Sequence, residues 1–169
     1  MELVPLREGS PLLEEVSRIN EEAFPPFERV SIEEMLSVPG RQGEGFCAIV
    51  EGGKAAGFLL YLLRSDVCFL GFLAVSEEMR SAGIGGNTLE LLKSKMAGKR
   101  IFLNAESPGP EADIRTRRIG FYARHGLVPC GLRTEFAGTE WTVLCSGPLS
   151  REEYTALMND AGTPFRFLA

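Results

Sequence analysis

An apolar run, a glycine-rich turn and a helical pattern follow one another in the middle of the chain. The run is CFLGFLAV (68–75), the turn is RSAGIGG (80–86), and the helical pattern is NTLELLKSKM (87–96). The apolar run predicts a strand, and the spacing of the leucines predicts a helix. Three glycines at such a junction leave main-chain N–H groups bare at the positive end of a helix. The junction therefore favours phosphate oxygens as a ligand.

Spacing separates the nucleotide-binding loops that use this device. A P-loop requires Lys after the glycines, whereas Asn87 follows Gly86. A dinucleotide fingerprint requires a third glycine where this chain has Thr88. The pattern that remains is RxxGxG, formed by Arg80, Gly83 and Gly85. The alternative is that the glycines form only a tight turn between a strand and a helix.

The rest of the chain predicts alternating elements around this junction. Gly52-Gly53 separates two apolar runs as a hairpin turn does, and Ser31 with Glu34 has the spacing of a capping box. We expect Ser10 to cap the first helix and Gly126 to end the fourth. Strands are expected at 2–6, 46–51, 55–63, 67–75, 100–105, 127–133 and 139–147, and helices at 11–23, 32–36, 84–96, 114–125 and from 150. This order predicts one α+β domain over residues 1–169 with a mixed sheet.

Charge and cysteine usage narrow the classes of protein. The net charge is −5, which argues against nucleic acid or an anionic membrane as a partner. Four scattered cysteines and one histidine argue against a metal site and favour reduced thiols in the cytoplasm. No stretch approaches the roughly 18 apolar residues needed to span a bilayer, so a cytoplasmic location is expected.

Two segments together resemble the GNAT superfamily of acetyl-coenzyme A-dependent N-acetyltransferases. They are FLAVSEEMRSAGIGGNTLELL around the RxxGxG pattern and RIGFYARHGL at 118–127. The resemblance implies a GNAT-like α+β fold, with a mixed central sheet of about seven strands and helices on both faces. It implies transfer of an acetyl group from acetyl-coenzyme A to a primary amine by direct attack in a ternary complex, without a metal.

The resemblance also implies a cofactor site. The main chain of Leu73, Ala74 and Val75 would pair with the pantetheine arm, where this strand and the next splay apart. Tyr122 would lie at the cofactor sulfur and protonate the leaving thiolate, for which a phenol is suited; the alternative is a purely packing role. Many members carry Asn where this chain has Arg115, so Arg115 either contacts phosphate or lies on a solvated face. The pyrophosphate would be held by the main-chain amides of Arg80, Ser81, Ala82, Gly83, Ile84, Gly85 and Gly86.

An amine acceptor needs a route to its neutral form. If its pKa is about 10.4, only about one molecule in 2,500 is neutral at pH 7, a cost of about 4.6 kcal/mol. The first candidate for the base is Glu106, at the end of IFLNAE, and the second is Glu28 in FPPFER. The alternatives are a solvated carboxylate for Glu106 and an ion pair with Arg29 for Glu28.

The acceptor itself is not specified by the sequence. A small-molecule or peptide amine is expected to bind among residues 24–36, 106–113 and 136–141. Two other functions share the same cofactor loop: a non-catalytic acyl-coenzyme A-binding module, and an acyltransferase with a different acyl donor. A homodimer is a further possibility, and the apolar C-terminal segment TPFRFLA would dock on its own chain or on a partner.

Overall fold

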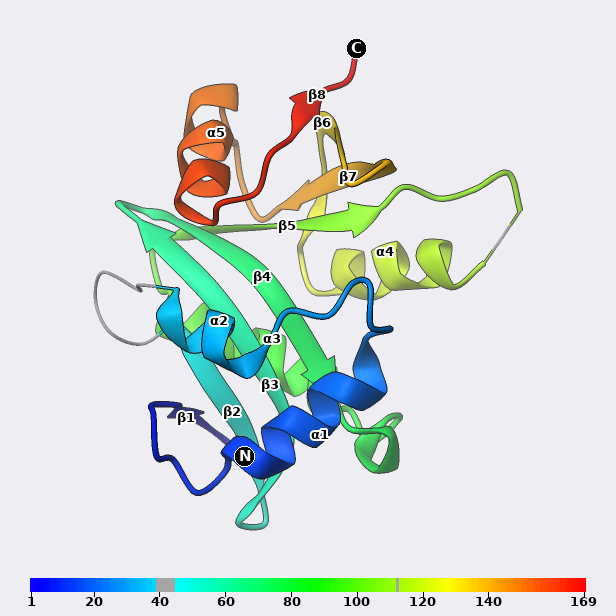
Figure 1. Cartoon of the computed structure of the whole chain (residues 1–169). Helices are drawn as coiled ribbons and strands as arrows, with labels where there is room; N and C mark the ends of the chain where they lie inside the picture. Colours follow the sequence, from blue (N-terminus) through cyan, green and yellow to red (C-terminus); the bar gives the residue numbers. More distant parts are fainter. Residues whose placement is uncertain (39–44, 112) are drawn as a thin grey trace. The chain divides into compact units, whose positions relative to one another are not determined.

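Eight strands, five α-helices and one short 3₁₀ helix occur in the described residues, 1–38, 45–111 and 113–169 of the computed structural model (Figure 1). The strands hydrogen-bond in the order β1-β2-β3-β4-β5-β7-β6-β8, with β4 and β5 parallel. This mixed sheet confirms the α+β prediction and adds one strand, β8, to the seven expected. Ala112, within the expected acceptor segment, lies outside the described residues. The bounds are β1 (Glu2–Pro5), α1 (Leu13–Ala23), α2 (Ile32–Ser37), β2 (Phe46–Glu51), β3 (Lys54–Arg64), β4 (Val67–Val75), η1 (Glu77–Met79), α3 (Ile84–Lys95), β5 (Arg100–Glu106), α4 (Ile114–Arg124), β6 (Val128–Phe136), β7 (Thr139–Cys145), α5 (Arg151–Asp160) and β8 (Arg166–Phe167).

The chain divides into two units that are interleaved in sequence. The first unit comprises residues 1–63 and 70–95, and the second comprises residues 64–69 and 96–169. Strand β4 contributes residues to both units.

In the first unit, helices cover both faces of the antiparallel strands β1, β2 and β3. Figure 1 shows α1 and α2 in front of these strands and α3 behind them. Alternate residues of a strand point to opposite faces, so one set supplies each core. The front core joins Val16, Ile19 and Met35 of the helices to Phe46, Ala48, Phe58 and Leu60 of the strands. The rear core joins Ile49 and Ala56 to Ile84 of α3.

Gly57 allows an unusually close approach of two main chains within this unit. A Cβ atom at Gly57 would lie 2.2 Å from the carbonyl oxygen of Ala74 and 3.0 Å from the Cδ1 atom of Ile49. No side chain fits at 2.2 Å from a main-chain oxygen, because the backbone itself would have to move. Gly57 therefore fixes where β3 holds the last residues of β4.

In the second unit, two helices lie on opposite faces of the strands. Helix α4 connects β5 to β6, and α5 connects β7 to β8. In the order β5-β7-β6-β8 each neighbouring pair is antiparallel, so β5 is parallel to β6 and β7 is parallel to β8. Such crossovers are almost always right-handed, and β5 and β7 run in opposite directions, so the two helices fall on opposite faces. Figure 1 shows α4 and α5 on either side of β5.

The face under α5 is built around the buried Tyr154. Its hydroxyl donates a hydrogen bond to Oδ1 of Asn104 (3.1 Å) and lies 3.2 Å from Oγ1 of Thr134. Its ring contacts Phe165 and Phe167 of the C-terminal segment at centroid distances of 5.0 and 5.6 Å. The segment TPFRFLA therefore docks on its own chain.

An ion-pair cluster around Arg100 ties the start of β5 to the start of α5. Its guanidinium contacts Asp66 at 3.0 Å and Glu153 at 2.6 Å. Hydrogen bonds from Arg100 and from the main chain of Ser150 lower the pKa of Glu153 to about 2. Glu153 thus supports both the ion pair and the N-terminal cap of α5.

The expected helix caps are correct in all but one case. The capping box of Ser31 and Glu34 begins α2, and Gly126 follows α4 with φ +81°. Ser10 does not cap α1; its Oγ accepts from the amide of Arg7 at 2.9 Å, and the helix begins only at Leu13. The hydroxyl closes the preceding turn instead, because Ser, Thr and Asx side chains bond equally well to turn amides. No helix in the described part of the chain is long and apolar enough to cross a membrane.

Candidate functional site

The glycine-rich loop forms a concave array of main-chain N–H groups in the first unit. Among the described residues, no hydrogen-bond acceptor is found for the amides of Ser81, Gly83, Ile84, Gly85 and Gly86. Ser81 (φ +70°) and Gly83 (φ +77°) both lie in the left-handed region, on either side of Ala82. Alternation of this kind turns successive N–H groups toward one point and makes an anion-binding nest. A loop of this kind can hold phosphate oxygens.

Two amides expected to bind the ligand are used within the loop itself. Arg80 donates its amide to the carbonyl of Glu77 at 3.3 Å, and Ala82 donates to Met79 at 3.4 Å. The Arg80 side chain also folds back, with Nε donating to the carbonyl of Val75 at 3.3 Å. Five of the seven amides, and not all seven, are therefore open, and Arg80 anchors the nest to the end of β4.

The last residues of β4 commit their side chains to packing. Ala74 faces the front core under α1 and α2, whereas Leu73 and Val75 face the rear core under α3. Ser76 continues the ladder by donating its amide to the carbonyl of Ala56 at 2.8 Å. A ligand along Leu73–Val75 would therefore be recognised through the main chain. The recorded pairing of β4 with β5 covers Val67–Phe69, and the splay beyond it stays a prediction.

Tyr122 lies on α4 in the second unit. Its ring is half-buried and lies 5.2 Å from the ring of Phe121. Burial raises the pKa of Tyr122, with a smaller opposing effect from the charge of Arg118. Within residues 1–38, 45–111 and 113–169, the hydroxyl has no hydrogen-bond partner. Tyr122 is therefore protonated at neutral pH, and its hydroxyl donates no hydrogen bond to a described residue.

Glu106 ends β5 on the face opposite to α4. It shares strand parity with Phe102 and Asn104, whose side chains contact Tyr154 of α5. The amide of Ser107 donates to the carbonyl of Glu140 at 3.0 Å, which continues the ladder beyond the strand. The carboxylate makes no hydrogen bond or ion pair with any described residue. Glu106 and Tyr122 thus lie on opposite faces of the same strands.

Other carboxylates at this end of the strands are engaged. Asp113 caps α4 and accepts from Nε of Arg115 at 2.7 Å, and these bonds lower its pKa. Glu140 pairs with Arg133, and Glu135 pairs with Arg166 at 2.6 Å. Glu106, whose charge acts on Arg115, is the carboxylate of this group without a hydrogen bond or close ion pair to a described residue.

Arg115 takes a structural position. Besides its ion pair with Asp113, its Nη2 atom lies 2.4 Å from where a Cβ atom at Gly109 would be. The guanidinium thus lies against the backbone of the loop that follows Glu106. A phosphate contact by Arg115 stays a prediction; in the structure its guanidinium interacts with Asp113 and feels the charge of Glu106.

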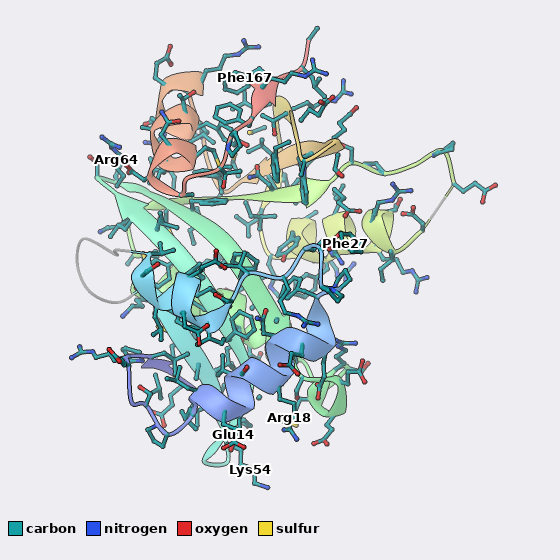
Figure 2. The ribbon with its side chains drawn as sticks, in the orientation of Figure 1. Glu14, Arg18, Phe27, Lys54, Arg64 and Phe167 are labelled. Carbon is teal, nitrogen blue, oxygen red and sulfur yellow. The ribbon has the colours of Figure 1, made fainter. Side chains whose placement is uncertain are left out.

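Glu28, the second candidate base, lies in the first unit on an exposed turn. Its amide donates to the carbonyl of Pro25 at 3.0 Å. Arg29 donates to the carbonyls of Glu21 and Phe24, both at 3.0 Å, and forms no ion pair with Glu28 among the described residues. The neighbouring Phe27 side chain is 85% exposed (Figure 2).

A cavity of about 690 Å³ lies elsewhere in the first unit and contains none of the expected site residues. Its lining carries both signs of charge, from Glu14, Glu78, Arg18 and Lys54 among others. In the described part of the chain, no group of three or more His, Cys, Asp and Glu side chains is placed to hold a metal.

Three features of the site were not found from the sequence. The close approach at Gly57 could have been predicted, because glycine inside a strand often marks a close backbone approach. The left-handed conformation of Ser81 could not have been predicted, since serine is common in loops of every conformation. The pairing of Glu106 with Trp141 depends on the register of β5 and β7, which only the folded strands reveal.

Known proteins resemble this chain in sequence pattern and in fold. The model of the acetyltransferase (GNAT) family matches residues 13–127. A GNAT-family protein from Bacteroides thetaiotaomicron superposes with a TM-score of 0.73 at 22% identity, covering 94% of each chain. The ribosomal-protein-S18-alanine N-acetyltransferase from Escherichia coli superposes with a TM-score of 0.67 at 17% identity, covering 89% of this chain and 96% of the other.

An aminoglycoside 6′-N-acetyltransferase complexed with coenzyme A gives the same TM-score, 0.67, at 16% identity, covering 89% of this chain and 99% of the other. A comparison with curated proteins found no significant match. The solved structures show the fold, and the family model spans more than half of the sequence and includes the nest and Tyr122. This chain therefore belongs to the GNAT acetyltransferase family.

Proposed function

We propose that the protein transfers an acetyl group from acetyl-coenzyme A to a primary amine, as one domain over residues 1–169. The observation that carries the proposal is the nest of five open amides at the start of α3. A diphosphate needs several donors at one point, and main-chain N–H groups at a helix N-terminus supply them together with a favourable dipole.

The residues of the first unit fit coenzyme A. The amides of Ser81, Gly83, Ile84, Gly85 and Gly86 would hold the pyrophosphate, and Arg80 and Ala82 would keep the nest in shape. The main chain of Leu73, Ala74 and Val75 would pair with the pantetheine arm. When bound, the cofactor supplies an activated acetyl group as a thioester.

The residues of the second unit fit acid and base roles. Glu106 accepts a proton from the ammonium form of the acceptor and leaves a neutral amine. The amine nitrogen then attacks the thioester carbonyl, the new C–N bond forms and the C–S bond breaks. Tyr122 gives its proton to the departing thiolate and is restored by the proton that the new amide nitrogen loses. The net products are the acetamide, free coenzyme A and one proton.

The two proton transfers occur at different moments. The base acts before the nitrogen attacks the carbonyl, and the acid acts when the tetrahedral intermediate collapses and the thiolate leaves. Glu28 remains the alternative base, because it is exposed and has no ion pair with Arg29.

Binding and turnover test the proposal in sequence. Acetyl-coenzyme A at 100 times its Kd should stabilise the protein by about 2.7 kcal/mol, which raises the Tm by several degrees. ATP and NADH serve as controls and should give no comparable shift. The absence of a Tm shift with all three ligands would contradict the cofactor assignment.

Release of free thiol in the presence of primary amines then tests transfer. Turnover that depends on the amine supports the proposal. A Tm shift without turnover for any amine would show a non-catalytic acyl-coenzyme A-binding module. A larger rate with succinyl- or propionyl-coenzyme A would show a different acyl donor.

A further inference from the structure

Trp141, the one tryptophan of the chain, lies directly opposite Glu106. The two residues are register partners in the antiparallel pair of β7 and β5, so their side chains share a face. Directly opposed Cβ atoms lie about 4.5–5.5 Å apart. The carboxylate of Glu106 therefore lies on the same face as the indole ring and next to it in the sheet.

The indole is held in one orientation. Its Nε1 atom donates to the carbonyl of Phe136 at 3.4 Å, and its ring stacks on the Phe136 ring at a centroid distance of 4.4 Å and an angle of 2°. Both rings come from the hairpin of β6 and β7, and both are half-buried. The hairpin thus presents a rigid aromatic stack, ordered before any ligand binds.

The cover supplied by α5 stops short of this stack. Tyr154 contacts Phe102 and Asn104 along β5, and its hydroxyl reaches Thr134, the register partner of Trp141 in β6. Thr134 is fully buried, whereas Glu106 and Trp141 remain partly exposed. The partly exposed end of this face therefore carries one carboxylate and one ordered aromatic stack.

These groups select the chemistry of a ligand. A carboxylate without a hydrogen bond or close ion pair among the described residues attracts an ammonium group, and an aromatic face attracts both a cation and another flat ring. Arg133 and Arg166 pair with Glu140 and Glu135, and Arg115 pairs with Asp113 while its guanidinium also feels the charge of Glu106. Because Glu106 and Trp141 are direct cross-strand neighbours, a ligand that contacts both needs only a short chain between its ammonium group and its ring.

We propose that the acceptor is a primary amine that carries an aromatic ring on a short alkyl chain. Its ammonium group binds at Glu106, and its ring extends the stack of Trp141 and Phe136. The inference rests on the acetyl transfer proposed above and specifies its acceptor. Glu106 first holds the ammonium and then takes the proton that must leave before the nitrogen attacks.

Fluorescence gives a direct test, because every tryptophan signal comes from Trp141. The full-length protein in saturating coenzyme A is titrated with 2-phenylethylamine and with 2-cyclohexylethylamine, which has the same size and charge but no aromatic face. We expect a saturable change in emission, with Kd about fivefold lower for the phenyl compound. Equal Kd values, or no saturable change for either amine, would overturn the proposal.

Two variants separate the charge from the ring. Glu106→Gln should raise Kd for 2-phenylethylamine at least tenfold, since a charge-assisted contact is lost. Glu152→Gln, an exposed carboxylate in the first turn of α5, is the matched control and should stay within twofold. Phe136→Leu should abolish the preference for phenyl over cyclohexyl. Unchanged binding in Glu106→Gln would contradict the assignment of the ammonium site.

Thiol release from acetyl-coenzyme A distinguishes failure of this inference from failure of the function. Turnover with 2-cyclohexylethylamine or an alanyl peptide at the rate of 2-phenylethylamine would overturn the aromatic acceptor and leave the transferase. Saturable binding of 2-phenylethylamine with no turnover of any amine would overturn the transferase and leave the binding site.

Discussion

The two units recognise their expected ligands by different means. In the first unit, the loop at 80–86 offers main-chain amides from consecutive residues, and its glycines are needed for conformation and not for contacts. In the second unit, Glu106, Trp141 and Tyr122 offer side chains from three separate elements. A main-chain site tolerates many side chains but depends on φ, whereas a side-chain site depends on chemistry and register. Substitutions that restrict φ should therefore lower cofactor affinity in the first unit, whereas substitutions that change side-chain chemistry should lower turnover in the second unit.

The largest effect expected from a side-chain change is that of Tyr122→Phe. Loss of a general acid costs about 10² or more in turnover, while the ring and its packing are kept. The Kd for acetyl-coenzyme A should stay within about twofold. Burial raises the pKa of Tyr122, so the wild-type rate attributed to this acid should hold up to its ordinary value near pH 10 and fall only above it. Turnover near the wild-type rate would remove Tyr122 from the mechanism.

Gly57→Ala tests the main-chain framework of the first unit. The new methyl meets the carbonyl of Ala74 at 2.2 Å, so β4 must move, and unfolding should become easier by about 2–3 kcal/mol. Gly120→Ala in α4 is the matched control. There the nearest atom is the flexible Nη1 of Arg124 at 3.7 Å, and alanine in a helix should stabilise by up to about 1 kcal/mol. Denaturant midpoints measure both, and a wild-type midpoint for Gly57→Ala would contradict the close approach.

Gly83→Ala tests the nest itself. A side chain at φ +77° costs about 1–2 kcal/mol, and the loop should relax away from the conformation that turns its amides together. Affinity for acetyl-coenzyme A should fall about tenfold. Gly98→Ala has the same φ of +77° in an exposed turn with open space around it, so it should lower the Tm similarly and leave affinity unchanged. Equal affinity losses in the two variants would mean that the loss comes from general destabilisation.

Glu153→Gln should give the smallest effect and concerns the second unit alone. Glutamine keeps the capping box but loses the ion pair with Arg100, for a loss below about 1 kcal/mol. The folded pKa of Glu153 is depressed to about 2, so its contribution is complete above its ordinary value near 4.5 and is lost as pH falls toward 2. The Tm gap between wild type and variant should therefore close below pH 4.5, with acetyl-coenzyme A affinity unchanged at pH 7. A gap that is constant with pH would contradict the ion pair.

The same contrast explains what was predictable from the sequence. The glycine-rich junction between a strand and a helix was predicted because its determinants are contiguous. The elements themselves were predicted because each carries its own period and caps, although α1 begins at Leu13 and β6 extends to Phe136. The partners of Glu106 were not found, because register sets which residue of β7 lies opposite it.

The remaining misses also arise from tertiary contacts. The two-residue β8 is too short to show a period, and it exists because Thr134 and Glu135 of β6 pair with Phe167 and Arg166. Arg115 reads as part of a basic helical face, yet Asp113 and the bare backbone of Gly109 draw its guanidinium into a loop contact. The local sequence around such residues is compatible with several conformations, and tertiary contacts determine which one is adopted.

The interleaving of the two units sets an order of events during synthesis. Residues 64–69 belong to the second unit but leave the ribosome before residues 70–95, which complete the first. Val67–Phe69 must therefore wait for Arg100–Phe102, their partners in the parallel pair, to be made. Neither unit corresponds to one continuous stretch of messenger RNA, so neither can be produced by truncating the chain at a single point.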